Sequence, residues 1–252
     1  MNKILGFLKK YWLTFVILAS MIALYWMVSE YGLINKMMFP KISSINSVFA
    51  SDFHTMLLNL TASIKLIIPS LLVTIAIALS LGILLGMSKY CRKAFYPIIY
   101  IFSCVPSVLL SPLVSAMSSN LVVSSIILIV YDSMFTLIFS TITGIESIDK
   151  RYLDNAKTMQ LRGPKLMFEV VLPAASPTIL GGFINALRSS FTILVFAEMF
   201  GSSFGLGYYI RRYSSLGIFP NVWAGFIFMV VVLVLIMYFF EKIKNYMLRW
   251  TN

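Results

Sequence analysis

Three charged residues interrupt the apolar stretches of this 252-residue sequence, and they could do chemistry inside a membrane: Asp132, Arg188 and Glu198. A charge in hydrocarbon is costly, so such residues usually pair with one another or line a polar pathway. Asp132 lies eleven residues after Leu121, and Arg188 lies twelve residues before Phe200. With a rise of ~1.5 Å per helical residue, these two charges fall at a similar depth near the middle of a membrane.

Two roles are open for this pair of charges. In the first, Asp132 and Arg188 form an ion pair between neighbouring helices, so that removing either partner leaves a buried charge. In the second, Arg188 lines a pathway and attracts an anionic solute. Glu198 is predicted near the outer end of its helix, where it either caps a gate or lies at the membrane interface.

The remaining polar residues do not suggest an enzyme. The phosphate-binding sequence G-x-x-x-x-G-K-[ST] is absent, so any ATP hydrolysis is expected in a partner. No paired acid and base, nucleophilic triad or metal cluster stands out, and His54 is the single histidine. Cys91 and Cys104 are too few for a disulfide framework. We therefore expect no catalytic residue, no metal and no cofactor bound by this chain.

The composition predicts an integral membrane protein. Apolar residues make up 60% of the chain and charged residues 12%, with a mean hydropathy of +0.91. Soluble domains are usually about a quarter charged. The net charge of +11 could suggest a nucleic-acid partner. The basic residues are not gathered on one soluble face, however, which argues against nucleic acid and leaves membrane lipid as the surrounding medium.

Six apolar runs are each close to the ~20 residues that a bilayer requires. They cover residues 11–29, 66–87, 95–117, 121–143, 177–200 and 222–240. The first could be a signal peptide, but it is long for one and lacks a small-residue cleavage site. Residues 30–59 are predicted to be irregular, 60–69 to be an amphipathic lead-in, and 201–220 to be an external loop. The sequence thus divides into an N-terminal helix with its external loop (1–59) and a five-helix core (60–252).

The distribution of basic residues predicts the orientation. Fourteen Lys and Arg residues fall in segments predicted inside, five fall outside, and Arg188 lies in a span. The inside group is Lys3, Lys9, Lys10, Lys89, Arg92, Lys93, Lys150, Arg151, Lys157, Arg162, Lys165, Lys242, Lys244 and Arg249. The outside group is Lys36, Lys41, Lys65, Arg211 and Arg212. Because basic residues favour the cytoplasmic side, we expect a multi-pass protein of the cell membrane with both termini cytoplasmic.

Two features of the spans concern packing. The third run contains Pro106 between Pro97 and Pro112, and prolines favour kinks where helices line a cavity. A kinked helix that only packs is the alternative. Gly82 and Gly86 form a GxxxG pair that lets another helix approach closely, which favours a homodimer. The alternative is that glycine is simply common in membrane helices.

The longest polar interval, residues 149–173, is basic and separates two spans. Asp149 is available as the N-cap of a short helix. Tyr152, Ala156 and Met159 then share one stripe of that helix. Gly163-Pro164 ends it, and a second short helix is predicted at 165–171, ending at Pro173. Such a helix–turn–helix loop is suited to docking onto a soluble partner.

The loop resembles the EAA loop of ABC-importer permeases, which reads Glu-Ala-Ala, three residues, Gly, nine residues, Ile-x-Leu-Pro. The matching positions here are Asp154, Asn155, Ala156, Gln160, Val170, Leu172 and Pro173. Asn155 replaces the first Ala and Gln160 replaces the Gly, so the docking turn is expected to differ in shape, with Gly163 compensating in part. The residues at 141–145, 148–149 and 197–199 are similar to the nitrate/sulfonate/taurine branch. The resemblance covers roughly 61–252.

This resemblance implies a type I permease fold in which residues 149–173 couple to a cytoplasmic ABC ATPase that binds ATP and Mg. It also implies a second permease copy and an extracytoplasmic substrate-binding protein. The substrate is left open among nitrate, sulfonates, taurine and vitamin precursors such as pyrimidines or riboflavin. A non-transporting scaffold or degenerate permease is the alternative function. A channel is disfavoured because no pore signature is repeated.

Overall fold

The computed structural model describes residues 2–32, 37–118 and 120–251, and every regular element in them is a helix. The elements are α1 (Asn2–Tyr31), α2 (Ile42–Met87), α3 (Lys89–Ser103), α4 (Ser107–Met117), α5 (Leu121–Glu146), α6 (Lys150–Thr158), α7 (Gly163–Leu166), the π-helical turn η1 (Met167–Val171), α8 (Leu172–Gly201), α9 (Leu206–Ser215), α10 (Phe219–Met247) and the 3-10 turn η2 (Arg249–Thr251). Five helices are long and apolar enough to cross a membrane, or six if α3 and α4 form one bent span. The predicted all-α membrane fold is confirmed.

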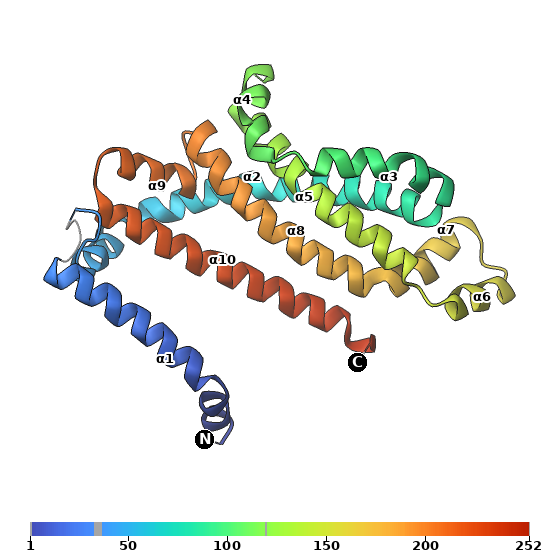
Figure 1. Cartoon of the computed structure of the whole chain (residues 1–252), viewed down its shortest axis with the longest axis horizontal. Helices are drawn as coiled ribbons and strands as arrows, with labels where there is room; N and C mark the ends of the chain where they lie inside the picture. Colours follow the sequence, from blue (N-terminus) through green and yellow to red (C-terminus); the bar gives the residue numbers. More distant parts are fainter. Residues whose placement is uncertain (1, 33–36, 119, 252) are drawn as a thin grey trace.

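Helix α5 is the centre of the bundle, packed between α2 and α8 (Figure 1). Its apolar side chains are buried, among them Ile129, Leu137 and Ile138. Small hydroxyl residues let the helices approach. The Thr74 hydroxyl on α2 and the Ser133 hydroxyl on α5 are hydrogen-bonded at 2.9 Å. Both residues are buried, so this contact fixes the depth of α2 against α5 without leaving a polar atom in hydrocarbon.

The two glycines of the GxxxG pair in α2 pack against another helix of the same chain. A Cβ on Gly82 would lie 2.6 Å from Thr141 Cβ, and a Cβ on Gly86 would lie 2.8 Å from Ile145 Cδ1. Both neighbours belong to α5. The predicted close approach is therefore correct, but its partner is a helix of the same chain, and the pattern gives no support to a homodimer.

Helix α2 replaces most of the region predicted to be irregular at 30–59 and the lead-in predicted at 60–69. It runs for 46 residues, or ~69 Å, without interruption at Pro69. Its polar residues fit a helix because their side chains bond to carbonyls one turn earlier, as at Ser47, Ser51 and Asn59. The opposite face buries Ile45, Val48 and Met56 against α9 and α10. Tertiary burial therefore overrides the weak local helix preference. The predicted external loop at 201–220 likewise contains α9.

The predicted third span is two helices, α3 and α4, bent by 89°. The break falls at residues 104–106, and Pro106 is the N-cap residue of α4 with φ −61° and ψ 128°. Proline has no N–H to donate and pushes the preceding residue out of the helical region, so the break has a direct cause. Pro97 and Pro112 lie inside helices that continue past them.

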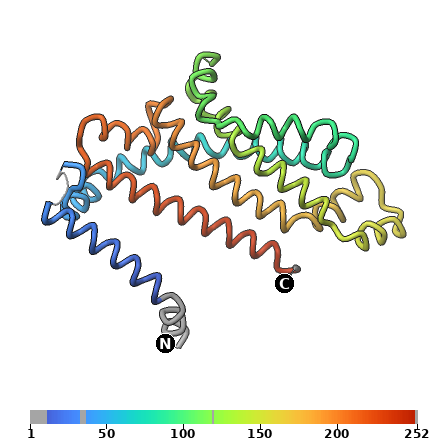
Figure 2. Tube along the Cα trace, viewed as in Figure 1, coloured from blue at the N-terminus to red at the C-terminus, as the bar shows by residue number. Residues whose placement is uncertain are grey.

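The loop helices α6 and α7 lie at one end of the bundle, and α9 lies at the other (Figures 1 and 2). Helices α1 and α10 both run away from the α9 end, so the two chain ends point in the same direction. That is the arrangement expected if both termini share a side with the loop. Which side faces the cytoplasm stays a prediction. Lys36 and the side chains of Lys3, Lys9 and Lys10 lie outside what the structure describes.

We predict that Gly82→Ala destabilises the bundle, because its Cβ overlaps Thr141. Overpacking of this kind costs about 1–3 kcal/mol, and we expect the apparent melting temperature to fall by about 5 °C. Gly181→Ala is the matched control, since a Cβ there meets no atom within 4 Å. Thermal unfolding of the two purified variants in one detergent checks this, and equal melting temperatures contradict it.

Candidate functional site

The polar loop, residues 149–173, begins with a capped helix. The Asp149 carboxylate accepts a hydrogen bond of 2.9 Å from the backbone N–H of Arg151 and two more from the Arg151 guanidinium. The predicted N-cap is confirmed. These bonds from Arg151 hold the pKa of Asp149 below its usual range. The cap therefore stays charged at neutral pH, where it also complements the positive end of the helix.

The turn after α6 has the backbone conformation that favours glycine. Gln160 has φ 56° and Gly163 has φ 57°. The Gln160 N–H donates to the Lys157 carbonyl at 3.0 Å, and the Leu161 N–H donates to that of Ala156 at 3.0 Å. Replacement of the motif glycine by Gln160 therefore leaves a left-handed turn in place, at the cost of some backbone strain.

Helix α6 presents a largely exposed face. Ala156 is buried, and α6 packs through this side against η1. The other motif residues of the loop, Asp154, Asn155, Gln160 and Gly163, are exposed. Asp154 and Lys157 form an exposed ion pair at 2.7 Å, a type that contributes little to stability. Tyr152 and Met159 are exposed rather than packed.

A groove of about 600 Å³ lies between α6 and the first turns of α8, and Trp250 near the chain end also lines it. The second loop helix was predicted to end at Pro173, and this is wrong. The chain stays helical from Gly163 to Gly201, and Pro173 comes directly after the π-helical turn at 167–171. Leu172 donates its N–H to the Met167 carbonyl, the five-residue spacing of a π-turn.

Asp132 on α5 is the centre of a second cluster, at the level of the α3–α4 break. The Ser107 hydroxyl of α4 donates to its Oδ1 at 2.8 Å, and the Ser189 hydroxyl of α8 donates to its Oδ2. One carboxylate thereby joins three helices. The Tyr131 hydroxyl donates to the Phe102 carbonyl at 2.6 Å, which ties α5 to the end of α3. A cavity of about 230 Å³ opens beside Asp132.

The predicted ion pair between Asp132 and Arg188 is not formed among the residues that the structure describes. Arg188 is exposed, while its neighbour Ser189 reaches Asp132. Consecutive helical residues point about 100° apart, so only one of the two can face α5. Spacing along the sequence predicted equal depth but not direction. The serine hydroxyls take the place that the guanidinium was expected to fill.

Glu198 does not lie at the interface. It is fully buried, and its Oε2 accepts a hydrogen bond of 2.8 Å from the Gly207 N–H at the start of α9. The two preceding amides of that segment, those of Gly205 and Leu206, donate to Asn59 and Ser63 of α2. Side chains of two spans thus cap α9. A Cβ on Gly205, where φ is 110°, would overlap the Glu198 carboxylate, so glycine is required there.

Sequence reasoning missed the hydroxyl and amide partners in both clusters. Ser107 and Ser189 looked like ordinary small residues of membrane helices, Asn59 was assigned to the irregular region and Ser63 to the lead-in. The only available signals were that Ser107 directly follows Pro106 and that Ser189 is adjacent to a charged residue.

A bundle of apolar helices with a polar centre at mid-depth and an exposed helical loop at one end is the architecture of a membrane transport subunit. The chain belongs to the family of binding-protein-dependent transport system inner membrane components, whose sequence pattern matches residues 75–251. This family consists of transport components rather than enzymes, and its members are multi-pass proteins of the cell membrane.

Known proteins agree with this assignment. The chain is 31% identical over 176 residues to a putative aliphatic sulfonates transport permease protein, SsuC, of Bacillus subtilis, covering 70% of this chain and 64% of the relative. It is 26% identical to the nitrate import permease protein NrtB of Synechocystis sp., covering 53% and 49%. The match thus spans less than two thirds of either relative. These relatives confirm the predicted nitrate/sulfonate branch of ABC-importer permeases.

A solved structure shows the same fold. The inward-facing MetNI methionine ABC transporter contains a chain that matches with a TM-score of 0.66 at 16% identity, covering 73% of this chain and 92% of that one.

We predict that Asp132 is coupled energetically to Ser189 and not to Arg188. In a double-mutant cycle, Asp132→Ala and Ser189→Ala should show an interaction of about 1 kcal/mol or more, because a hydrogen bond to a charged group is lost only once. Asp132→Ala and Arg188→Gln should add to within about 0.5 kcal/mol. Thermal unfolding of the six forms measures both terms. A large interaction free energy between Asp132 and Arg188 would instead support the predicted ion pair.

Proposed function

We propose that this chain is the membrane permease subunit of an ATP-driven importer for a small solute. A separate ABC ATPase docks on residues 149–173, and an extracytoplasmic binding protein delivers the solute. The observation that carries the proposal is the coupling loop, residues 149–173: α6 is capped, Leu153 and Ala156 seat it on the bundle, and its motif residues Asp154 and Asn155 are exposed. This chain lacks a phosphate-binding loop of its own, so the ATPase must be another subunit.

The loop is connected to the polar centre by one helical segment. Helix α6 packs on η1, which continues without a break into α8. Helix α8 carries Ser189 to Asp132 and Glu198 to the start of α9. A displacement of α6 when the ATPases close is therefore passed along α8 to both clusters. This continuity supports a mechanism in which nucleotide binding moves the walls of the pathway.

The side of the bundle that carries the α3–α4 break is the proposed wall of that pathway. Residues 104–106 have irregular backbone and Cys104 is exposed, a combination that lipid does not tolerate. Arg188 is exposed near mid-depth, where hydrocarbon would penalise its charge. Both features are accommodated if a second copy of the chain encloses an aqueous path there, so we infer a homodimer.

We propose a small oxyanion as the solute, with aliphatic sulfonates and nitrate the first to test. The names of the relatives motivate this choice, and the exposed Arg188 forms no ion pair within residues 2–32, 37–118 and 120–251. Asp132, held by two hydroxyls, orients the walls rather than attracting the anion. A non-transporting scaffold is the alternative, and it would retain the ATPase but show no ATP-driven uptake.

The proposal is tested by co-purification. We expect an ABC ATPase to purify with the wild-type chain and to be lost with Asp154→Lys, because the charge is reversed on the exposed face of α6. Glu241→Lys is the matched control: it makes the same charge reversal at an exposed position of α10 outside the loop. Mass spectrometry identifies the partners. If no ATPase accompanies the wild type, or if both variants lose it, the docking role is wrong.

A second prediction concerns the turn. Gln160→Pro should abolish ATPase binding, because proline fixes φ near −65°, far from 56°, and removes the N–H that bonds to Lys157. Gln160→Gly should retain binding and stabilise the loop by up to about 1 kcal/mol through relief of strain. Affinity of the purified ATPase for each variant in nanodiscs measures this. Retention of full affinity by the proline variant contradicts the role assigned to the turn.

A further inference from the structure

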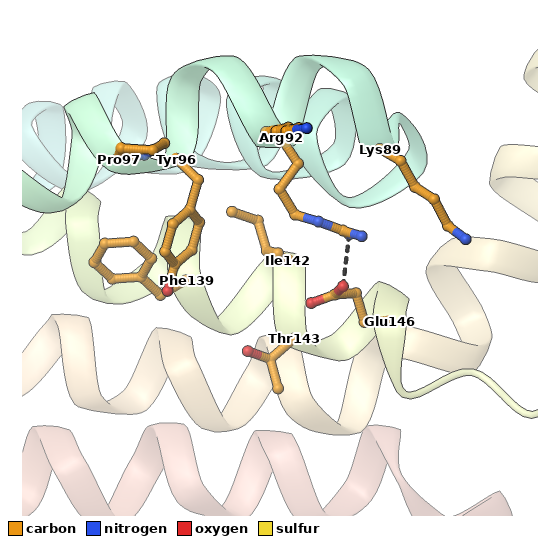
Figure 3. A pocket seen from close by; sticks show the side chains of 9 residues that line it. Lys89, Arg92, Tyr96, Pro97, Phe139, Ile142, Thr143 and Glu146 are labelled. Atoms are coloured by element: carbon orange, nitrogen blue, oxygen red, sulfur yellow. Dashed lines mark ion pairs between the residues drawn. The ribbon is translucent and has the colours of Figure 1, made fainter.

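A basic groove lies between α3 and α5, at the end of the bundle that carries the coupling loop (Figure 3). Its volume is about 590 Å³. Lys89, Arg92 and Lys93 of α3 line one side, and Glu146 of α5 lies opposite. The side chains of Lys89 and Arg92 extend from α3 towards α5. None of the functions discussed above uses these residues.

The groove has an excess of positive charge. Arg92 Nη1 lies 2.7 Å from Glu146 Oε1, so this carboxylate balances one of the three cations. Lys89 and Lys93 take part in no ion pair among residues 2–32, 37–118 and 120–251, and both are exposed. Two positive charges thus remain uncompensated, on one face of α3 at a spacing of four residues.

The helix itself adds to this charge. Lys89 is the first residue of α3, and the first turn contains no acidic residue. The N-terminus of a helix carries a partial positive charge, so cations there are unfavourable and an anion is favourable. Without an anion, the lysines at this helix N-terminus therefore lower the stability of the folded protein. A bound anion would make the electrostatic contribution of the groove stabilising.

The rest of the groove also has ordered walls. Tyr96 and Phe139 pack at 5.5 Å between ring centroids and form its inner wall. The half-buried Arg92 guanidinium is held in place by Glu146, with further N–H groups left to donate. Phe139 also lines the separate cavity beside Asp132.

We propose that this groove binds a tetrahedral oxyanion of the phosphate or sulfate type through Lys89, Lys93 and Arg92. Such an oxyanion could come from two sources at this end of the bundle: the headgroup of an anionic phospholipid, or a small free anion. Basic pockets between membrane helices are known to take phosphate headgroups. The site requires neither the ATPase nor the identity of the transported solute, so its test is separate from that of the importer function.

The experiment uses the full-length chain, with any partners that co-purify, in nanodiscs of phosphatidylcholine. The first arm adds sodium sulfate or inorganic phosphate, with sodium chloride at equal ionic strength as the reference. The second arm replaces part of the lipid by phosphatidylglycerol. The melting temperature is measured in each. Specific binding to the folded state should raise it by about 5 °C at saturation.

The variant Lys89→Gln/Lys93→Gln should lose this rise, and single Lys93→Gln should reduce it if the double variant folds poorly. Lys242→Gln/Lys244→Gln is the matched control, with the same loss of charge outside the groove. A sulfate or phosphate response in phosphatidylcholine assigns a free anion, and a response to phosphatidylglycerol alone assigns the lipid headgroup. No rise in either arm, or an equal rise in the groove and control variants, overturns the proposal.

Discussion

The structure depends on one constraint: within hydrocarbon, every polar group of the backbone and side chains needs a partner inside the protein. Serine and threonine hydroxyls return their hydrogen bonds to the preceding turn, as Ser70 and Thr141 do. Where α3 ends, the Tyr131 hydroxyl donates to the Phe102 carbonyl, which also accepts from the Val105 N–H. Where charge is unavoidable, Asp132 draws donors from two neighbouring helices. The hydrogen bonds that satisfy these polar atoms therefore also hold neighbouring helices together.

The same constraint keeps the backbone helical between the two ends of the molecule. The segment from Gly163 to Gly201 is continuous, with a π-turn at its start rather than a hinge. At its far end, Glu198 holds the first turn of α9, and the Asp52 carboxylate of α2 accepts hydrogen bonds from Tyr209 and Tyr213 on the same helix. Helix α9 is thus fastened to two long helices, α2 and α8.

Periodicity and composition were sufficient for the helical class and for the capped loop helix, because each rests on local features such as Asp149, but they did not show the bend that divides the third predicted span into α3 and α4. The sequence could not predict the features that depend on which way a side chain points from its helix, or on contacts with residues distant in the sequence. The residues Arg188 and Ser189 are adjacent, yet only the structure shows which one faces α5. The outer half of α2 looks polar in isolation and is helical because α9 and α10 cover Ile45 and Met56. The GxxxG pair predicted close packing correctly but not whether its partner came from the same chain.

The length of α2 has a mechanical consequence. At ~69 Å it is more than twice the ~30 Å thickness of a bilayer core, so a large part of it projects beyond the membrane as a rigid rod. Helix α5 holds the C-terminal half of α2, from Leu66 to Gly86, so the N-terminal half is the longer free arm. A tilt of roughly 10° about Leu66 moves the N-terminal end of α2 by about 6 Å. A displacement of α9 and α10, which pack on that arm, is therefore transmitted along α2 to its contact with α5.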